Sequence, residues 1–197
     1  MTETPTHDPV TYATPPDAVL IGRSTTDPRA FAHLYQRHHD AVFVYLAARV
    51  GSAHADDLVA ETFLAAFTAR HRFRSDLGSG ALPWLLGIAT RRLGRHRDLE
   101  RRWLRARTAP YAAGEPDETS RGDDIDARLD AARVAPDLAN ALAQLRRKDR
   151  DPLLLHVIGG LQYDEIAAAL ELPIGTVRSR ISRARTRLAG ILDGAAR

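Results

Sequence analysis

Apolar residues recur at three- and four-residue spacing through the first half of the chain, as they do in helices that bury one stripe. One such stretch covers residues 31–50, and Gly51 is expected to end it. A second begins within residues 53–57, where acidic side chains suit the positive end of a helix dipole, and continues to Phe67. No stretch alternates strictly between apolar and polar residues, as half-buried strands do. The pattern therefore predicts an all-α fold.

Turn-forming residues separate this second helix from a third one. Residues 74–80 contain serine, aspartate and glycine and are predicted to form a loop, and Pro83 then suits the first turn of a helix. The apolar stripe of this helix is formed by Trp84, Leu85, Ile88 and Leu93. Eight arginines and only two acidic residues lie within positions 91–107. The third helix is therefore expected to continue as a strongly basic extension.

Two stretches break the helical pattern and divide the chain. Residues 1–26 begin with a polar, proline-rich segment that cannot bury enough apolar surface to offset chain entropy, so we predict a disordered tail. Residues 108–132 combine proline and glycine with an excess of acidic residues, which predicts a flexible acidic linker. Two helical domains are therefore expected, over residues 27–107 and 133–197.

The second domain ends in a pattern typical of a helix-turn-helix. A helical stretch over residues 134–145 comes first, followed by a helix that we expect to begin at Pro152 and to stop at a glycine pair. A short helix over residues 163–170, a tight turn over 171–175 and a second helix capped by Thr176 complete the pattern. This domain is therefore predicted to bind DNA.

The second helix of this motif divides into faces at about 100° per residue. One narrow stripe, expected to face the core, is formed by Val177, Ile181, Ala184 and Leu188. Short hydroxyls and one arginine lie opposite and further arginines flank them, as a helix in the major groove requires. The candidate DNA contacts are Thr176, Arg178, Ser179, Arg180, Ser182, Arg183 and Arg187. A solvated basic face is the alternative, but solubility does not require five arginines without an acid between positions 176 and 188.

The charge composition also favours an anionic partner. The formal net charge is only +3, but of the 28 basic residues only Lys148 is a lysine, and the arginines cluster. A GC-rich genome would explain the shortage of lysine but not the clustering. The planar guanidinium of arginine binds phosphates and carboxylates through two hydrogen bonds at once, which lysine cannot do.

The composition excludes several classes of protein. The chain has no cysteine, which excludes disulfides, cysteine-based zinc sites and a thiol nucleophile. No apolar run approaches the roughly 18 residues of a membrane span, and the N-terminus lacks a signal-peptide core, so a cytoplasmic location is expected. No metalloprotease, P-loop or nucleophile-elbow motif occurs, so we expect no catalytic residue, cofactor or metal. His38 and His39 would point about 100° apart on a helix and are predicted to be surface residues.

Segments in both domains resemble the extracytoplasmic-function group of the sigma-70 family of sigma factors. Region 2 of that family is resembled by Asp-Leu-Val-Ala-Glu-Thr-Phe at 57–63, Phe-Arg at 73–74 and Pro-Trp-Leu-Leu-Gly-Ile-Ala at 83–89. Region 4 is resembled by Leu-Gln-Tyr-Asp-Glu-Ile-Ala at 161–167 and Pro-Ile-Gly-Thr-Val-Arg-Ser-Arg at 173–180. The resemblance implies an RNA polymerase sigma factor. The alternative is a free-standing helix-turn-helix regulator that binds duplex DNA without polymerase.

In that family, the helix that carries the first region-2 motif docks on the clamp helices of the polymerase largest subunit. The polymerase contacts that the resemblance implies here are Asp57, Leu58, Glu61, Thr62, Phe63 and Phe67. Packing in the core is the competing role for Phe63 and Phe67. Ala60 stands where the family usually has glutamine, so one polar contact to polymerase is not carried over.

The family uses the following loop and helix to capture and melt the minus-ten promoter element. A melted strand is held by basic side chains along its backbone, and the candidates are Arg74, Arg91, Arg92 and Arg95. Trp84 could stack on a base, but its apolar phase favours the core. Thr90 and Arg91 replace the family's frequent Arg-Asn, so the base preference of the family is not carried over.

The resemblance also implies partners and a division of roles. The first domain would dock on polymerase and open the minus-ten element, while the second would read the minus-thirty-five element as duplex. The implied partners are core RNA polymerase, through its clamp helices and flap, promoter DNA, and an anti-sigma factor that nothing in the sequence identifies. The acidic linker would pass through the polymerase interior, and polymerase itself would supply the catalytic residues.

Overall fold

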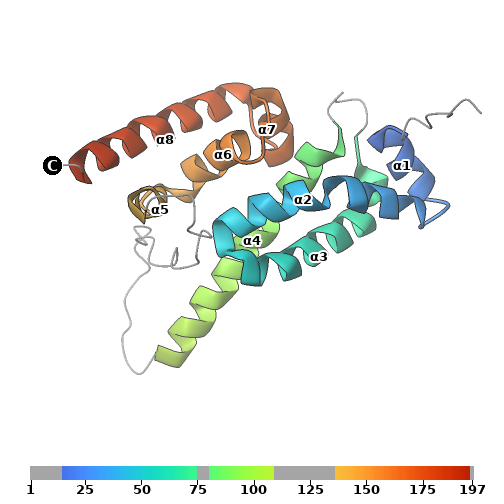
Figure 1. Ribbon diagram of the computed structural model, residues 1–197, viewed down its shortest axis with the longest axis horizontal. Helices are drawn as coiled ribbons and strands as arrows, with labels where there is room; N and C mark the ends of the chain where they lie inside the picture. The colour runs from blue at the N-terminus through green and yellow to red at the C-terminus, as the bar shows by residue number, and fades with distance from the viewer. Residues whose placement is uncertain (1–14, 75–79, 109–135, 196–197) are drawn as a thin grey trace, which may run out of the picture.

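The computed structural model describes residues 15–74, 80–108 and 136–195, and every regular element in that part of the chain is helical (Figure 1). The N-terminal helices are α1 (Asp17–Ser24), α2 (Ala30–Val50), α3 (Ser52–Ala69) and α4 (Ala81–Thr108), with a short 3₁₀ turn, η1 (Arg70–Arg72), after α3. The C-terminal helices are α5 (Pro136–Ala143), α6 (Arg147–Val157), α7 (Tyr163–Leu170) and α8 (Ile174–Ala195). The predicted all-α fold is confirmed for the described residues.

The N-terminal helices form because their apolar stripes meet in one core. Gly51, with a φ of 79° that disfavours other residues, ends α2 and lets α3 turn back along it. The helix α4 packs on this hairpin, and the fully buried side chains include Leu34, Val42, Leu46, Leu58, Leu85, Leu86 and Leu93. The helices predicted over 31–50 and from 53–57 onward are therefore confirmed.

The predicted disordered tail over residues 1–26 is wrong for its last third. Residues 17–24 form α1, whose Leu20 and Ile21 are buried against the N-terminal core. The apolar run at 18–21 has only four residues and shows no helical period, and a helix of eight residues depends on tertiary packing rather than on its own propensity. Residues 1–14 lie outside the described part of the chain.

Two helix starts in the C-terminal domain also differ from the predictions. The helix α6 begins at Arg147, not at Pro152. Its first turn consists of charged residues and shows no apolar stripe, and its buried Asp149 is paired with Arg183. The helix α8 begins at Ile174, so Thr176 does not cap it. The carbonyl of Pro173 instead accepts the N–H groups of Thr176 and Val177 at 2.9 and 3.2 Å.

The two sets of helices pack against each other, mainly through α4 against α7 (Figure 1). Gly87 of α4 lies so close to Ala169 of α7 that a Cβ at Gly87 would stand 3.1 Å from the carbonyl carbon of Ala169. Gly159 meets the side chain of Leu86 in the same way. Apart from Thr108, the last residue of α4, the predicted linker over 108–132 lies outside the described residues.

The prediction that His38 and His39 are both surface residues is wrong for His38. Its side chain is only 12% exposed and points between α1 and α4, whereas the His39 side chain is about a third exposed beside Asp40. Helix phase predicted that the two rings diverge, but not that α1 covers one of them.

Candidate nucleic-acid interface

The helix α8 has the two faces that its sequence predicts. Val177, Ile181 and Ala184 are buried, and Leu188 packs partly against the same core. On the outer side, the exposed candidates for DNA contact are Arg178, Ser179, Ser182, Arg183 and Arg187, while Thr176 and Arg180 are half-buried. The helix therefore presents arginines and small hydroxyls together on a surface that a duplex could reach.

Arg183 is held in place by an acid that the sequence pattern did not indicate. Its Nη2 donates to Oδ1 of Asp149 in α6 at 3.1 Å, while 56% of the Arg183 side chain stays exposed. A charge-assisted hydrogen bond at one side of a guanidinium limits its rotation and leaves its other donors available. The orientation of Arg183 is thus set by a contact within its own domain.

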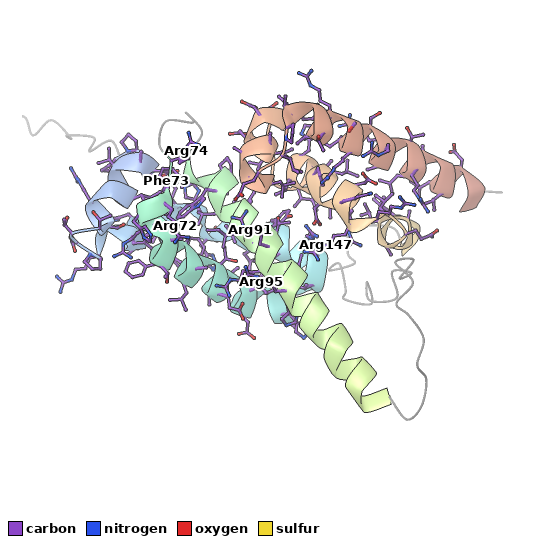
Figure 2. The ribbon with its side chains drawn as sticks, turned by 180° about the vertical axis from the view of Figure 1, so that it is seen from behind. Arg72, Phe73, Arg74, Arg91, Arg95 and Arg147 are labelled. Atoms are coloured by element: carbon purple, nitrogen blue, oxygen red, sulfur yellow. The ribbon has the colours of Figure 1, made fainter. Side chains whose placement is uncertain are left out.

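Of the candidate minus-ten arginines, Arg91 and Arg95 lie along α4 and Arg74 lies near its start (Figure 2). Arg95 is exposed, and Arg92 pairs with Glu61 of α3 at 3.8 Å. Arg91 donates to the carbonyl of Ala169 at 3.1 Å and lies 3.5 Å from the carboxylate of Glu171. In this arrangement, the Arg91 guanidinium is therefore engaged in contacts with the helix-turn-helix domain.

Trp84 serves the packing role that its phase predicted. Its ring is partly buried and meets the edge of Phe73, with ring centroids 5.2 Å apart. The segment that carries Phe73 and the exposed Arg74 is thereby tied to the first turns of α4 (Figure 2).

Of the six candidate polymerase contacts on α3, only Asp57 and Glu61 are exposed. Leu58, Thr62 and Phe63 are between 0 and 4% exposed and belong to the core. Phe67 is partly buried, with its ring against Phe31 and the Arg70 guanidinium.

Sequence reasoning missed one residue on this surface, Leu64, which is 67% exposed. Its signal was present, because Leu64 follows Glu61 by three residues and Asp57 by seven and so shares their face of the helix. A single exposed apolar side chain is common on protein surfaces, so Leu64 is a candidate contact because it shares the face of Asp57 and Glu61.

An open cavity of about 360 Å³ between α3 and α4 is lined by His54, Asp57, Leu58, Ala60, Glu61 and His96. Its polar walls belong to the same surface as the exposed acids of α3. Within the described residues, no three histidine, cysteine or acidic side chains come together in a way that could hold a metal ion.

A buried polar cluster joins the two domains. Arg49 of α2 pairs with Asp151 of α6 and donates to the hydroxyl of Tyr45 at 2.5 Å, and that hydroxyl lies 2.7 Å from Thr90 Oγ1. Burial alone would lower the pKa of Arg49, but the neighbouring Tyr45 and Asp151 raise it overall. Burial also raises the pKa of Tyr45. The cluster therefore joins the two domains through buried ionic and hydrogen-bonded contacts.

No helix among the described residues is both long and apolar enough to cross a membrane.

Comparison with known proteins matches both domains. The family model described as Sigma-70 region 2 matches residues 34–103, and the model described as Sigma-70, region 4 matches residues 136–188. The ECF RNA polymerase sigma factor SigC of Mycobacterium tuberculosis is 38% identical over 149 residues, which cover 74% of this chain and 73% of SigC. RNA polymerase sigma factor CnrH of Cupriavidus metallidurans is 33% identical over 192 residues, which cover 90% of this chain and 94% of CnrH.

Among solved structures, the chain is similar to CnrH in complex with the cytosolic domain of CnrY. The TM-score is 0.63 at 29% identity, and the match covers 90% of this chain and 97% of the other.

Proposed function

The chain belongs to the extracytoplasmic-function group of the sigma-70 family of RNA polymerase sigma factors, and on that premise we propose how its surfaces share the initiation of transcription. Sigma factors direct core polymerase to promoters. In our proposal, the outer face of α3 docks on the clamp helices of the polymerase largest subunit, the arginines of α4 hold the opened minus-ten strand, and α8 reads the minus-thirty-five duplex. The observation that carries the proposal is the outward arginine and hydroxyl face of α8 in the same chain as the exposed acids of α3.

The chain has to open for both promoter elements to be bound together. The two elements are separated by about 25 base pairs, which is roughly 85 Å of duplex at about 3.4 Å per base pair. In the described structure, which we call the closed arrangement, Arg91 lies 3.5 Å from Glu171. Only two residues separate Glu171 from α8. We therefore propose that polymerase binds an opened form, in which α7 leaves α4 and frees Arg91.

The proposal also assigns a location and a class of partner. Polymerase supplies the catalytic residues, so the chain would act without enzymatic activity of its own, in the cytoplasm where bacterial DNA lies. The structure of CnrH contains a bound protein, the cytosolic domain of CnrY. On that basis, we also propose that this chain binds a protein partner of the anti-sigma type.

Removing both exposed acids of α3 should weaken docking on polymerase. We expect Asp57→Ala with Glu61→Ala to lower the affinity for core polymerase by about tenfold, because charges at the edge of an interface guide association and pair with the partner. The matched control is Asp27→Ala with Asp40→Ala, which removes the same charge from exposed positions outside α3. Fluorescence anisotropy of the labelled chain, titrated with core polymerase, measures both. Equal affinities for the two double variants would contradict the assignment of α3.

Removing Arg183 should weaken duplex binding without changing docking. We expect Arg183→Ala to lower holoenzyme affinity for a minus-thirty-five duplex roughly 5- to 150-fold, the range for losing one good contact to a base edge. Arg146→Ala removes an exposed arginine of the same domain that is not part of α8 and serves as the control. If the isolated chain bound this duplex as tightly as the holoenzyme did, the result would favour a free-standing regulator over the proposed action within a holoenzyme.

A further inference from the structure

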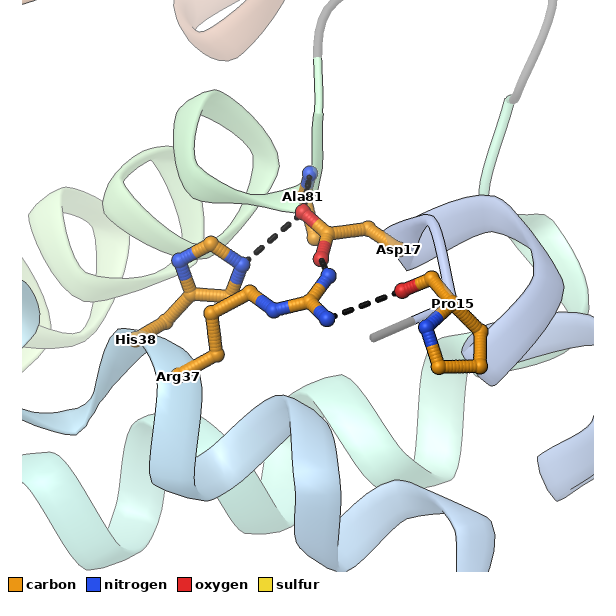
Figure 3. Close-up of polar contacts among 5 residues, drawn as sticks. All are labelled: Pro15, Asp17, Arg37, His38 and Ala81. Atoms are coloured by element: carbon orange, nitrogen blue, oxygen red, sulfur yellow. Dashed lines mark hydrogen bonds and ion pairs between the residues drawn. The ribbon is translucent and has the colours of Figure 1, made fainter. Parts of the chain in front are cut away.

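A single carboxylate ties α1 and α2 to the start of α4 (Figure 3). Asp17, the first residue of α1, is almost fully buried. Its Oδ2 accepts the backbone N–H of Ala81, the first residue of α4, at 2.7 Å, and lies 2.8 Å from Nε2 of His38. Its Oδ1 accepts Nη1 of Arg37 at 2.5 Å. The carboxylate thus joins α1 and its neighbour α2 to α4, which begins 64 residues after Asp17.

This contact supplies the N-terminal cap of α4 from 64 residues away. The first N–H groups of a helix have no partner within the helix, and a negative charge there is favoured by the helix dipole. Burial alone would raise the pKa of Asp17, but the N–H of Ala81, the Arg37 guanidinium and His38 hold it below its usual value. The group is therefore ionised at neutral pH, as a strong acceptor requires.

The space around the carboxylate is also closed. A Cβ at Gly80 would stand 2.9 Å from Oδ2 of Asp17, so a side chain there would push the carboxylate off its position. Arg37 is held from its other side, because its Nη2 donates to the carbonyl of Pro15 at 2.8 Å. The position of the α4 terminus relative to α1 and α2 is therefore fixed by several contacts.

From that terminus, the contacts lead to a candidate DNA-binding residue. Ala81 and Trp84 lie in the first turn of α4, and the ring of Trp84 packs on Phe73, next to Arg74. Without the cap, the first turn of α4 would fray, because its orphan N–H would lie buried without a partner. There would then be no fixed position, relative to α1 and α2, for Trp84, Phe73 and the backbone of Arg74.

We propose that Asp17 is a positioning residue for promoter opening, which it supports by holding the start of α4, and through Trp84 and Phe73 the segment of Arg74, in the geometry that the minus-ten strand requires. The inference rests on the proposed function. It gives α1 a role in promoter opening, although Asp17 itself touches no DNA.

The test compares opening, docking and duplex binding in the reconstituted holoenzyme. A promoter is first selected with the wild-type chain and core polymerase from a duplex pool randomised across both elements. Permanganate reactivity of unpaired thymines then gives the rate of opening. A forked form of the same promoter, unpaired at the minus-ten element, measures capture of the open strand.

We expect Asp17→Ala to lower the opening rate and the affinity for the forked promoter by about tenfold, since loss of one buried cap is worth about one factor of ten. Affinities for core polymerase and for the minus-thirty-five duplex should stay within about twofold, because α3 and α8 are untouched. Asp17→Asn should recover only part of the opening, since its amide oxygen can still accept the N–H of Ala81 while its NH2 group would face the Arg37 guanidinium. Gly80→Ala should lower opening while keeping the acid, and Asp40→Ala, at a fully exposed acid, should change nothing.

Several results would overturn the inference. Opening by Asp17→Ala at the wild-type rate would do so directly. A loss of core binding equal to the loss of opening would show that the domain merely unfolds. Failure of the wild-type chain itself to open any promoter would instead remove the proposed function, and this inference with it.

Discussion

Replacing Phe63 with alanine should lower the free energy of unfolding by about 3–5 kcal/mol, the usual cost of emptying a buried aromatic site. Phe63 is 4% exposed and meets the ring of Tyr35 at a centroid distance of 4.7 Å. Leu64→Ala, one position along the same helix, should change stability by no more than about 0.5 kcal/mol, because its side chain already lies in water. Denaturant unfolding followed by tryptophan fluorescence measures both, since both tryptophans of the chain belong to α4.

The two variants distinguish packing in the core from docking on polymerase. Family resemblance alone does not separate these two roles on α3. We expect Leu64→Ala, and not Phe63→Ala, to affect polymerase binding out of proportion to its effect on stability. An unchanged unfolding midpoint in Phe63→Ala, together with lost binding to core polymerase, would mean that Phe63 reaches the partner and that the described packing of α3 is wrong.

Replacing Arg49 with methionine should separate the two domains. Removing one partner of a buried ion pair usually costs about 3–5 kcal/mol, because the remaining charge stays buried without compensation. We expect the lower end of that range, since Arg147 lies within 3.5 Å of Asp151 and partly compensates it. The cost falls on the contact between α2 and α6, so the closed arrangement should become less populated.

The absence of cysteine makes this change measurable. Cysteines introduced at the exposed positions Thr68 and Ala189 would carry the only thiols of the chain, so labels attach at these two positions. Energy transfer between the labels then reports the distance between the domains. Arg49→Met should lower the transfer, and Arg49→Met with Asp151→Leu should restore part of it by replacing the pair with apolar packing. Transfer that stays the same in Arg49→Met would contradict a closed form held by this pair.

The sequence was sufficient for the elements whose burial follows one apolar period. The helices α2, α3 and α8 are of this kind, and the phase of α8 correctly separated Val177 and Ile181 from the exposed Arg178 and Arg183. The helix α1 was missed because its apolar run is too short to show a period. The start of α6 was missed because charged residues that pair inside a protein look the same in sequence as charged residues in water.

Partners across the fold were beyond the sequence for a related reason. Periodicity indicates which face of a helix is buried, but not what lies against it. Arg49 and Asp151 are 102 residues apart, and Arg183 and Asp149 are 34 apart, so no local pattern joins them. Family resemblance identified positions such as Leu58 and Thr62 as candidate contacts but did not indicate whether their side chains are exposed. The candidates on α3 therefore included both core and surface residues.

The central claim is that this chain reads two promoter elements only as part of a polymerase holoenzyme. It is tested most directly by run-off transcription from the randomised duplex pool, followed by sequencing of the transcribed templates. The wild-type chain with core polymerase should enrich two elements about 25 base pairs apart. Arg183→Ala should weaken selection of the upstream element alone, and Asp57→Ala with Glu61→Ala should weaken enrichment of both. Enrichment of one duplex element by the isolated chain, with no transcription when core polymerase is added, would contradict the claim.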